Sequence, residues 1–259
     1  MMAVIKRSAP KKAYEGDYLF MKSYVCPVCD NKINSATVKA GSARMIGQDW
    51  DLRPIHKDID VQKYDVLHCN KCGFAVLKRY FGVLPKPHKE LILKKISEQY
   101  QPIAEPVGKV LTYDEALTRY KLALVCAAIR QVHDSELGLI TLKIAWLYRA
   151  QRLALGDDYE SLTKAERIKY NAFEDSEEKY LKKAMDYLIK ARQTEEPPIA
   201  GMNETAIDFL LASLCGHFGK FDDAARLVSG ILQSKQSSSS QKDRARDMLD
   251  EFKSKRDRT

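Results

Sequence analysis

Two Cys-x2-Cys pairs constrain the fold of this chain more than any other feature of its sequence. Cys26 and Cys29 form the first pair, Cys69 and Cys72 form the second, and 39 residues lie between the pairs. Each pair offers two sulfur ligands from one tight turn, and zinc takes four such ligands in a tetrahedron. We therefore expect the four thiolates to meet around one structural Zn²⁺ ion.

Other chemistry remains open for the same four cysteines. Disulfides are rare in the cytosol, and no βαβ pattern surrounds either pair, as it would in a thioredoxin-like redox protein. An iron–sulfur cluster also takes four thiolates and stays an alternative. A catalytic zinc site more often keeps one position open and includes histidine. His68 precedes Cys69 directly, so we expect it to lie beside the site rather than to bind the ion.

The character of the sequence changes along the chain and predicts an α+β protein that is mostly α. A small β-rich, zinc-ribbon-like module is followed by a tetratricopeptide-like array of helical hairpins. The predicted parts are a basic N-terminal arm (1–22), the zinc-ribbon-like module (23–84), a linker with a short helix (85–111), the helical domain (112–233), and a flexible joint with a polar C-terminal helix (234–259). We expect the helical domain to fold alone.

Local signals predict where the helices begin. Side chains that accept hydrogen bonds from free amide groups precede several segments with periodic apolar residues. These are the capping boxes Thr112–Glu115 and Thr163–Glu166, Asp134 or Ser135, and Asn203. The periodicity predicts helices over about 113–132, 134–155, 164–192, 203–216, 222–233 and 242–255.

The helical half carries a repeat-like signal. Residues 203–233 read as a helix, a Gly-Lys-Phe turn and a second helix, which resembles one tetratricopeptide unit, and residues 113–155 form a hairpin of similar size. Arrays of this kind present a concave surface to a protein partner, whereas a plain helical bundle is the alternative. We expect Trp146 to lie in the core, because three leucines share its helix face. The alternative is that Trp146 lines a groove.

The charge of the chain is unevenly distributed. The formal net charge is +8, and residues 1–112 contain 19 Lys and Arg against 11 Asp and Glu, whereas residues 113–259 contain 24 of each. The basic half makes nucleic acid a possible partner. No apolar run is long enough to span a membrane, and no signal peptide is evident at the N-terminus. We therefore expect a cytoplasmic protein without membrane contact.

A polar stretch between the cysteine pairs is a second candidate site. Its residues with possible chemistry are Arg44, Asp49, Asp51 and His56. They would suit a second metal or an active site, but a charged loop that packs Trp50 on the zinc module explains them as well. No phosphate-binding loop, dinucleotide-binding fingerprint, nucleophile elbow or zinc-protease motif occurs in the chain. We therefore expect no catalytic residues.

Several motifs together resemble one known family. They are CPVC, DWDL, YDVLHCNKCGFA, YKLALVC, IAWLYR and FGKFDDA. The chain resembles, over about residues 24–233, the bacterial domain-of-unknown-function family numbered 2225. The resemblance implies a zinc-ribbon-like module followed by tetratricopeptide-like helices in a bacterial cytosolic protein, and it implies no activity. By position, the family's four cysteines fall on Cys26, Cys29, Cys69 and Cys72, and its acidic pair falls on Asp49 and Asp51.

These observations predict a non-enzymatic zinc-binding scaffold or adaptor that presents its helical half to a protein partner. The first alternative is a nucleic-acid-binding protein that uses the basic zinc module. The second alternative is a metal-dependent enzyme that uses the polar loop. The remaining cysteines, Cys126 and Cys215, lie on apolar helix faces and are expected to be small core residues.

Overall fold

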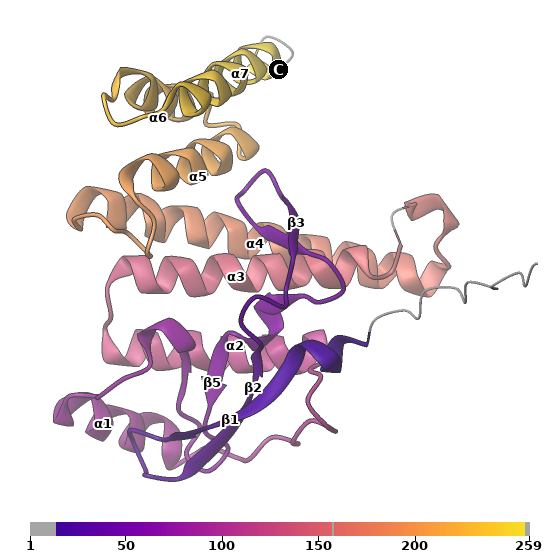
Figure 1. Cartoon of the computed structure of the whole chain (residues 1–259), viewed down its shortest axis with the longest axis vertical. Helices are drawn as coiled ribbons and strands as arrows, with labels where there is room; N and C mark the ends of the chain where they lie inside the picture. Colours follow the sequence, from indigo (N-terminus) through magenta and orange to yellow (C-terminus); the bar gives the residue numbers. More distant parts are fainter. Residues whose placement is uncertain (1–13, 157, 257–259) are drawn as a thin grey trace, which may run out of the picture.

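The computed structural model describes residues 14–156 and 158–256. Its α-helices are α1 (Lys86–Ile92), α2 (Tyr113–Arg130), α3 (Asp134–Leu153), α4 (Lys164–Thr194), α5 (Glu204–His217), α6 (Phe221–Gln233) and α7 (Ser239–Arg256). Helices α2 to α7 stack in chain order along the long axis of the molecule (Figure 1). The predicted class, α+β and mostly α, is confirmed.

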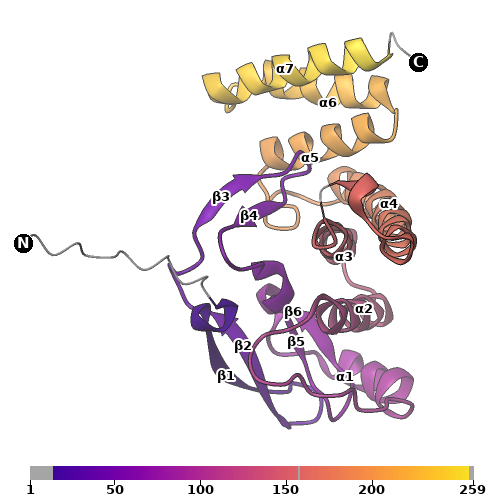
Figure 2. The same cartoon turned by 90° about the vertical axis from the view of Figure 1, so that its right-hand side faces the viewer.

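In the described residues, the strands pair as antiparallel hairpins. They are β1 (Leu19–Val25) with β2 (Lys32–Val38), β3 (Met45–Gln48) with β4 (Pro54–His56), and β5 (Val66–His68) with β6 (Ala75–Leu77). The cysteine pairs occupy the loops of the first and third hairpins. The β3–β4 hairpin extends away from the other two and lies along the side of α3, α4 and α5 (Figure 2).

The predicted N-terminal arm joins the β part directly. Its residues 1–13 lie outside the described residues. A 3-10 turn, Glu15–Tyr18, then leads into β1. The carboxylate of Glu15 accepts hydrogen bonds from Lys63 at 2.7 Å and from the hydroxyl of Tyr64 at 2.9 Å. Residues 19–22 of the predicted arm therefore belong to a strand, and Leu19 is fully buried.

The helix starts follow the capping chemistry in three of four cases. Thr112 and Thr163 each exchange hydrogen bonds with the glutamate three residues later, so both capping boxes are present. The side chain of Asn203 accepts a hydrogen bond from the amide of Ala206 at 2.9 Å. These helices begin where their own side chains satisfy the first free amides.

The prediction that Asp134 or Ser135 caps α3 is wrong. The residue at the N-cap is His133, whose side chain makes no capping hydrogen bond. The amide of Ser135 instead donates to the carboxylate of Glu195 at 2.9 Å, just beyond the end of α4. A neighbouring helix thus supplies the acceptor that we expected from a local side chain.

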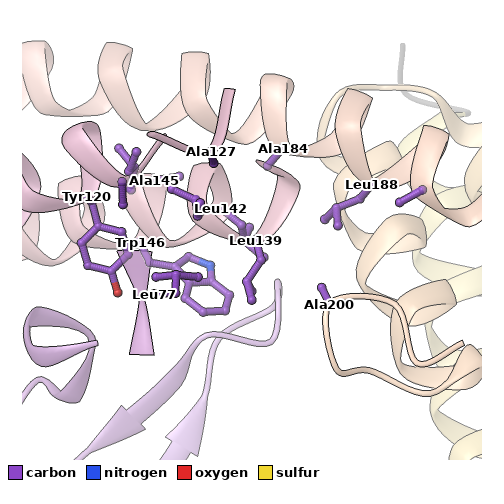
Figure 3. Packing of buried hydrophobic residues seen from close by; sticks show 14 of the residues in the cluster. Leu77, Tyr120, Ala127, Leu139, Leu142, Ala145, Trp146, Ala184, Leu188 and Ala200 are labelled. Atoms are coloured by element: carbon purple, nitrogen blue, oxygen red, sulfur yellow. The ribbon is translucent and has the colours of Figure 1, made fainter. Parts of the chain in front are cut away.

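One buried hydrophobic cluster runs from the first cysteine pair to the last helix, Cys26 to Phe252. Figure 3 shows Leu77 of β6 near Tyr120 of α2 and Trp146 of α3 within this cluster. Trp146 is only 6 % exposed, so it lies in the core as expected. Because β5 and β6 pack against α2, buried contacts cross the predicted boundary at residue 112.

Helices α3 and α4 approach each other closely at one glycine. A Cβ atom at Gly138 would come within 2.7 Å of the side chain of Leu188, which is fully buried. A larger residue would push the helices apart at the centre of the core. Gly138 therefore allows the two long helices to approach closely at this crossing.

The end of the serine-rich tract forms the first turn of the last helix. The predicted flexible joint covers residues 234–241, but α7 begins inside it at Ser239. The amide of Ser238 donates to the side chain of Gln241 at 2.8 Å, and the amide of Gln241 donates back to Ser238 at 3.3 Å. This exchange resembles a capping box, and it starts the helix three residues earlier than predicted.

None of the helices within residues 14–256, Asp157 set aside, is both long and apolar enough to cross a membrane.

Candidate metal centre

The two cysteine pairs sit in loops of the same construction. The amide of Cys26 donates to the carbonyl oxygen of Asn31 at 2.9 Å, and the amide of Cys69 donates to that of Phe74 at 2.8 Å. In each case this hydrogen bond closes the loop at the end of the flanking hairpin. The strands on both sides therefore fix the positions of the sulfur atoms.

The residue after each pair adopts a left-handed backbone conformation. Asp30 has φ +57° and Gly73 has φ +75°, and their amides donate to the carbonyl oxygens of Cys26 and Cys69 at 3.0 and 2.9 Å. Glycine adopts this conformation without strain, and aspartate tolerates it, so Asp30 and Gly73 form the same turn. Gly73 is required for a second reason, because a Cβ atom there would lie 2.5 Å from the ring of Tyr100.

The four sulfur atoms converge from the two loops. The Sγ atoms of Cys26 and Cys72 are 3.7 Å apart, and those of Cys29 and Cys69 are 3.6 Å apart. All four lie within 4.8 Å of one another. Zn–S bonds of about 2.3 Å in a tetrahedron place sulfur atoms about 3.8 Å apart, whereas a disulfide requires about 2.05 Å. The predicted ligand set is thus assembled, and it can bind one metal ion.

The cysteine thiols are mostly buried and hydrogen-bond with one another. Cys26 and Cys69 are fully buried and Cys72 is 3 % exposed. Hydrogen bonds from the thiols of Cys26 and Cys72 hold the pKa of Cys69 well below its usual value. Hydrogen bonding with Cys69 in turn raises the pKa of Cys26 to about 12. One thiolate is therefore favoured already, and a bound cation would drive the others to ionise.

Polar neighbours brace the second cysteine loop without entering the ligand set. The imidazole Nε2 of His68 lies 2.8 Å from the hydroxyl of Tyr100, which donates to Asn70 at 2.8 Å. That arrangement makes Nε2 the donor to Tyr100, and burial lowers the pKa of His68 to about 4. The histidine is thus a neutral neighbour of the site, as expected. Ser97 also donates to the carbonyl oxygen of Cys72 at 2.8 Å.

The candidate polar site between the cysteine pairs is only partly brought together. Asp49 and Asp51 converge on Arg149 of α3, whose Nη1 lies 3.1 Å from Asp49 and 2.8 Å from Asp51. Asp51 is fully buried and also accepts a hydrogen bond from the indole nitrogen of Trp146 at 2.9 Å. The Nε of Arg149 donates to Glu177 of α4 at 2.6 Å. These charges pair with one another and bind the β3–β4 hairpin to the helices.

The other two candidate residues stand apart from this network. Arg44 is exposed, and His56 is half-buried on β4 with a buried Nδ1 that has no hydrogen-bond partner. Within the described part of the chain, no hydrogen bond or ion pair joins either residue to Asp49 or Asp51. Within residues 14–156 and 158–256, the four cysteines are the only group of three or more His, Cys, Asp or Glu side chains that could hold a metal ion.

Trp50 packs on the helical half and not on the zinc module, where we expected it. Its ring stacks on that of His217 in α5 with centroids 4.7 Å apart, and the Arg149 guanidinium lies 5.2 Å from its centre. His217 also lies 2.7 Å from the carboxylate of Glu178. Neither Arg149 nor Glu177 stands out in the sequence, although Arg149 shares a helix face with Trp146, three residues earlier.

The two remaining cysteines are core residues, as predicted. Cys126 is fully buried and Cys215 is 1 % exposed. Burial raises the pKa of both thiols to about 11, so neither is ionised at neutral pH. The sulfur of Cys126 accepts a hydrogen bond from the amide of Ala75 at 3.3 Å, which attaches β6 to α2.

Comparison with known proteins supports the resemblance carried by these motifs. The family model described as "Uncharacterized protein conserved in bacteria (DUF2225)" matches residues 19–252. Searches of curated proteins and of solved structures returned no match. The matched region contains the four cysteines, the three hairpins and almost all of the helical stack. The chain therefore belongs to the DUF2225 family of bacterial proteins.

Proposed function

We propose that the chain is a non-enzymatic zinc-binding scaffold that presents its helical half to a protein partner. The proposal rests on the closed set of four sulfur atoms, most of them buried. A catalytic zinc keeps a coordination position open for water or substrate, whereas four thiolates leave none. A zinc ion held in this way stabilises the fold and carries out no reaction.

The spacing of the sulfur atoms favours one zinc ion over an iron–sulfur cluster. The pairs at 3.6 and 3.7 Å are close to the value of about 3.8 Å for one tetrahedral zinc, and several iron atoms would hold the ligands farther apart. The ion would tie residues 26–31 to residues 69–74, whose strands pack on α2. Thiolates of this kind persist in a reducing compartment, so the proposal includes a cytoplasmic location.

A groove on the helical half supports the partner-binding role. It lies between α4, α5 and α6 and has a volume of about 620 Å³. Apolar side chains, Leu211 and Leu227, line it together with charged ones, Lys220 and Arg226. Helices α5 and α6 meet at Gly219, which has φ +70°, as the predicted tetratricopeptide-like hairpin requires. Such a mixed lining suits an extended peptide segment of a partner.

A pull-down with a matched control tests the scaffold role. Tagged full-length protein is incubated with bacterial lysate, and bound proteins are identified by mass spectrometry. We expect Leu227→Glu to lose the bound partner, because it places a charge in the groove, whereas Ile168→Glu on the exposed start of α4 should keep it. Equal capture by both variants would contradict the groove, and no enrichment by the unmodified protein would contradict the scaffold role.

A second candidate function is nucleic-acid binding by the β module. Strand β1 leaves Phe20 39 % exposed and Met21 47 % exposed. Phe20 and Lys22 share one face of this strand, where a ring can stack on a base and an amine can contact a phosphate. Binding of labelled single-stranded RNA should then be weak, with a salt slope of about −0.7 per phosphate contact. Binding that is tight and insensitive to salt would contradict this candidate.

A further inference from the structure

A polar cleft lies beside the second cysteine loop, on the side facing residues 103–111. It has a volume of about 260 Å³. One wall is β2, and the opposite wall is the segment that leads into α2. A water molecule occupies about 30 Å³, so the cleft has room for a small organic molecule.

One of the cationic side chains that line the cleft has no ion-pair partner among the described residues. Arg119 projects from α2, and its Nε is buried and forms no hydrogen bond. No carboxylate in the described residues forms an ion pair with its guanidinium. Burial lowers the pKa of Arg119, although the nearby charges of Glu105 and Glu115 act in the opposite direction. The side chain of Arg119 is half-buried, and partial desolvation of a guanidinium without a paired anion is uncompensated.

The other polar groups of the cleft leave Arg119 available. The carboxylate of Glu105 accepts a hydrogen bond from Asn70 at 2.8 Å and is thereby held in place. Lys32 and Lys109 also line the cleft and add two positive charges. Three cationic side chains, Lys32, Lys109 and Arg119, thus line the cleft together with one carboxylate, that of Glu105.

We propose that this cleft binds a small organic anion through a phosphate or carboxylate group held by Arg119. A guanidinium presents its N–H groups as a planar fork that matches two oxygen atoms of either group. Lys32 and Lys109, which also line the cleft, add long-range attraction. The site is separate from the groove between α4, α5 and α6, and the proposal does not rest on the scaffold role.

Thermal melts of the full-length, metal-loaded protein test the proposal. Inorganic phosphate and acetate are titrated separately, with chloride used to keep the ionic strength constant. At ten times the dissociation constant, a bound anion should raise Tm by about 3–6 °C. A rise with phosphate alone assigns a phosphate ligand, and a rise with acetate alone assigns a carboxylate ligand. No saturable rise with either anion would overturn the proposal.

Substitutions test whether the rise in Tm depends on Arg119. Arg119→Met keeps most of the side-chain volume and removes the charge, so it should abolish the rise and should not lower Tm in the absence of anion. Lys94→Gln removes a charge on the exposed surface of residues 93–97 and should leave the rise unchanged. Arg119→Lys should weaken anion binding at least tenfold by calorimetry, because an ammonium cannot form the paired contact. The proposal would be contradicted if anion still raised the Tm of Arg119→Met. It would also be contradicted if that variant, without anion, had a lower Tm than the unmodified protein.

Discussion

Asp51 and Arg149 lie 98 positions apart in the chain and form a doubly hydrogen-bonded ion pair, with Oδ1 2.8 Å from Nη1 and Oδ2 2.7 Å from Nη2. The carboxylate is fully buried and the arginine is 5 % exposed. The same carboxylate accepts the indole hydrogen of Trp146 at 2.9 Å. The pair therefore fixes the tip of the β3–β4 hairpin onto the C-terminal part of α3.

Replacing Asp51 should destabilise the protein strongly. In Asp51→Asn the buried guanidinium keeps Asp49 and Glu177 but loses the carboxylate to which it donates two hydrogen bonds. Removing one member of a buried pair costs about 3–5 kcal/mol, which is the upper limit here because two carboxylates remain. Asp250→Asn is the control, because Asp250 pairs with Lys253 on the exposed surface and should cost less than about 1 kcal/mol. Urea denaturation of both variants measures the difference. Equal losses would mean that the buried pair adds no more than a surface pair.

The cysteines and the helix starts were predictable because their signals are local. A Cys-x2-Cys turn carries its ligand geometry within four residues, and a capping box carries its hydrogen bonds within the same span. Accordingly, the four sulfur atoms converge and Thr112 and Thr163 cap their helices. These features depend little on the remainder of the fold.

The polar loop could not be interpreted in the same way, because its partners are remote. The contact between Asp51 and Arg149 depends on how a hairpin is placed on a helix, and no spacing in a single sequence encodes that placement. The amide of Ser135 illustrates the same limit, since its acceptor, Glu195, is 60 positions away. For this reason the sequence grouped Arg44 and His56 with Asp49 and Asp51, whereas the structure joins the two aspartates to α3.

The metal content of the protein should be one zinc per chain. Protein purified without added metal is analysed by mass spectrometry of the elements, and Cys69→Ser should reduce zinc to near zero because three thiolates and a hydroxyl bind it far less tightly. Cys215→Ala removes a buried thiol outside the cluster and should retain the zinc. Iron in place of zinc would contradict the zinc assignment, and the absence of both metals would contradict the site.

Lys78 should make stability depend on pH in alkaline solution. Burial lowers its pKa to about 8, while the amine donates to the carbonyl oxygen of Ala36 at 2.8 Å. The unfolded chain, with a lysine pKa near about 10.4, binds more protons than the folded chain between these values. The contribution of Lys78 to stability therefore rises from pH 8 to pH 10.5, by at most about 3 kcal/mol.

The variant Lys78→Met isolates this effect from other titrations. The difference in unfolding free energy between the natural chain and the variant is measured by urea denaturation at several pH values. This difference in unfolding free energy should shift in favour of the natural chain as the pH rises from 8 to 10.5. A difference that stays constant from pH 8 to pH 10.5 would show that Lys78 keeps an ordinary pKa.

The helical segment 112–233 should depend on the β module for a cooperative melt. The sequence predicts that this segment folds alone, since it has its own helix starts and periodic apolar residues. In the structure, however, the inner face of α2 is covered by β5 and β6. The hydroxyl of Tyr120 donates to the carbonyl oxygen of Gln62 at 2.9 Å, and the sulfur of Cys126 accepts a hydrogen bond from the amide of Ala75.

Removal of residues 1–111 would expose this face and leave those polar groups without partners, so the packing of α2 on α3 should loosen. We expect the isolated segment to retain much of its helical circular dichroism but to lose a sharp thermal transition, whereas the full chain should melt in one step. Near-ultraviolet circular dichroism of Trp146, which lies in the shared core, reports directly on this packing. A sharp transition of the isolated segment, at a temperature close to that of the full chain, would instead support an independent domain from residue 112 onward.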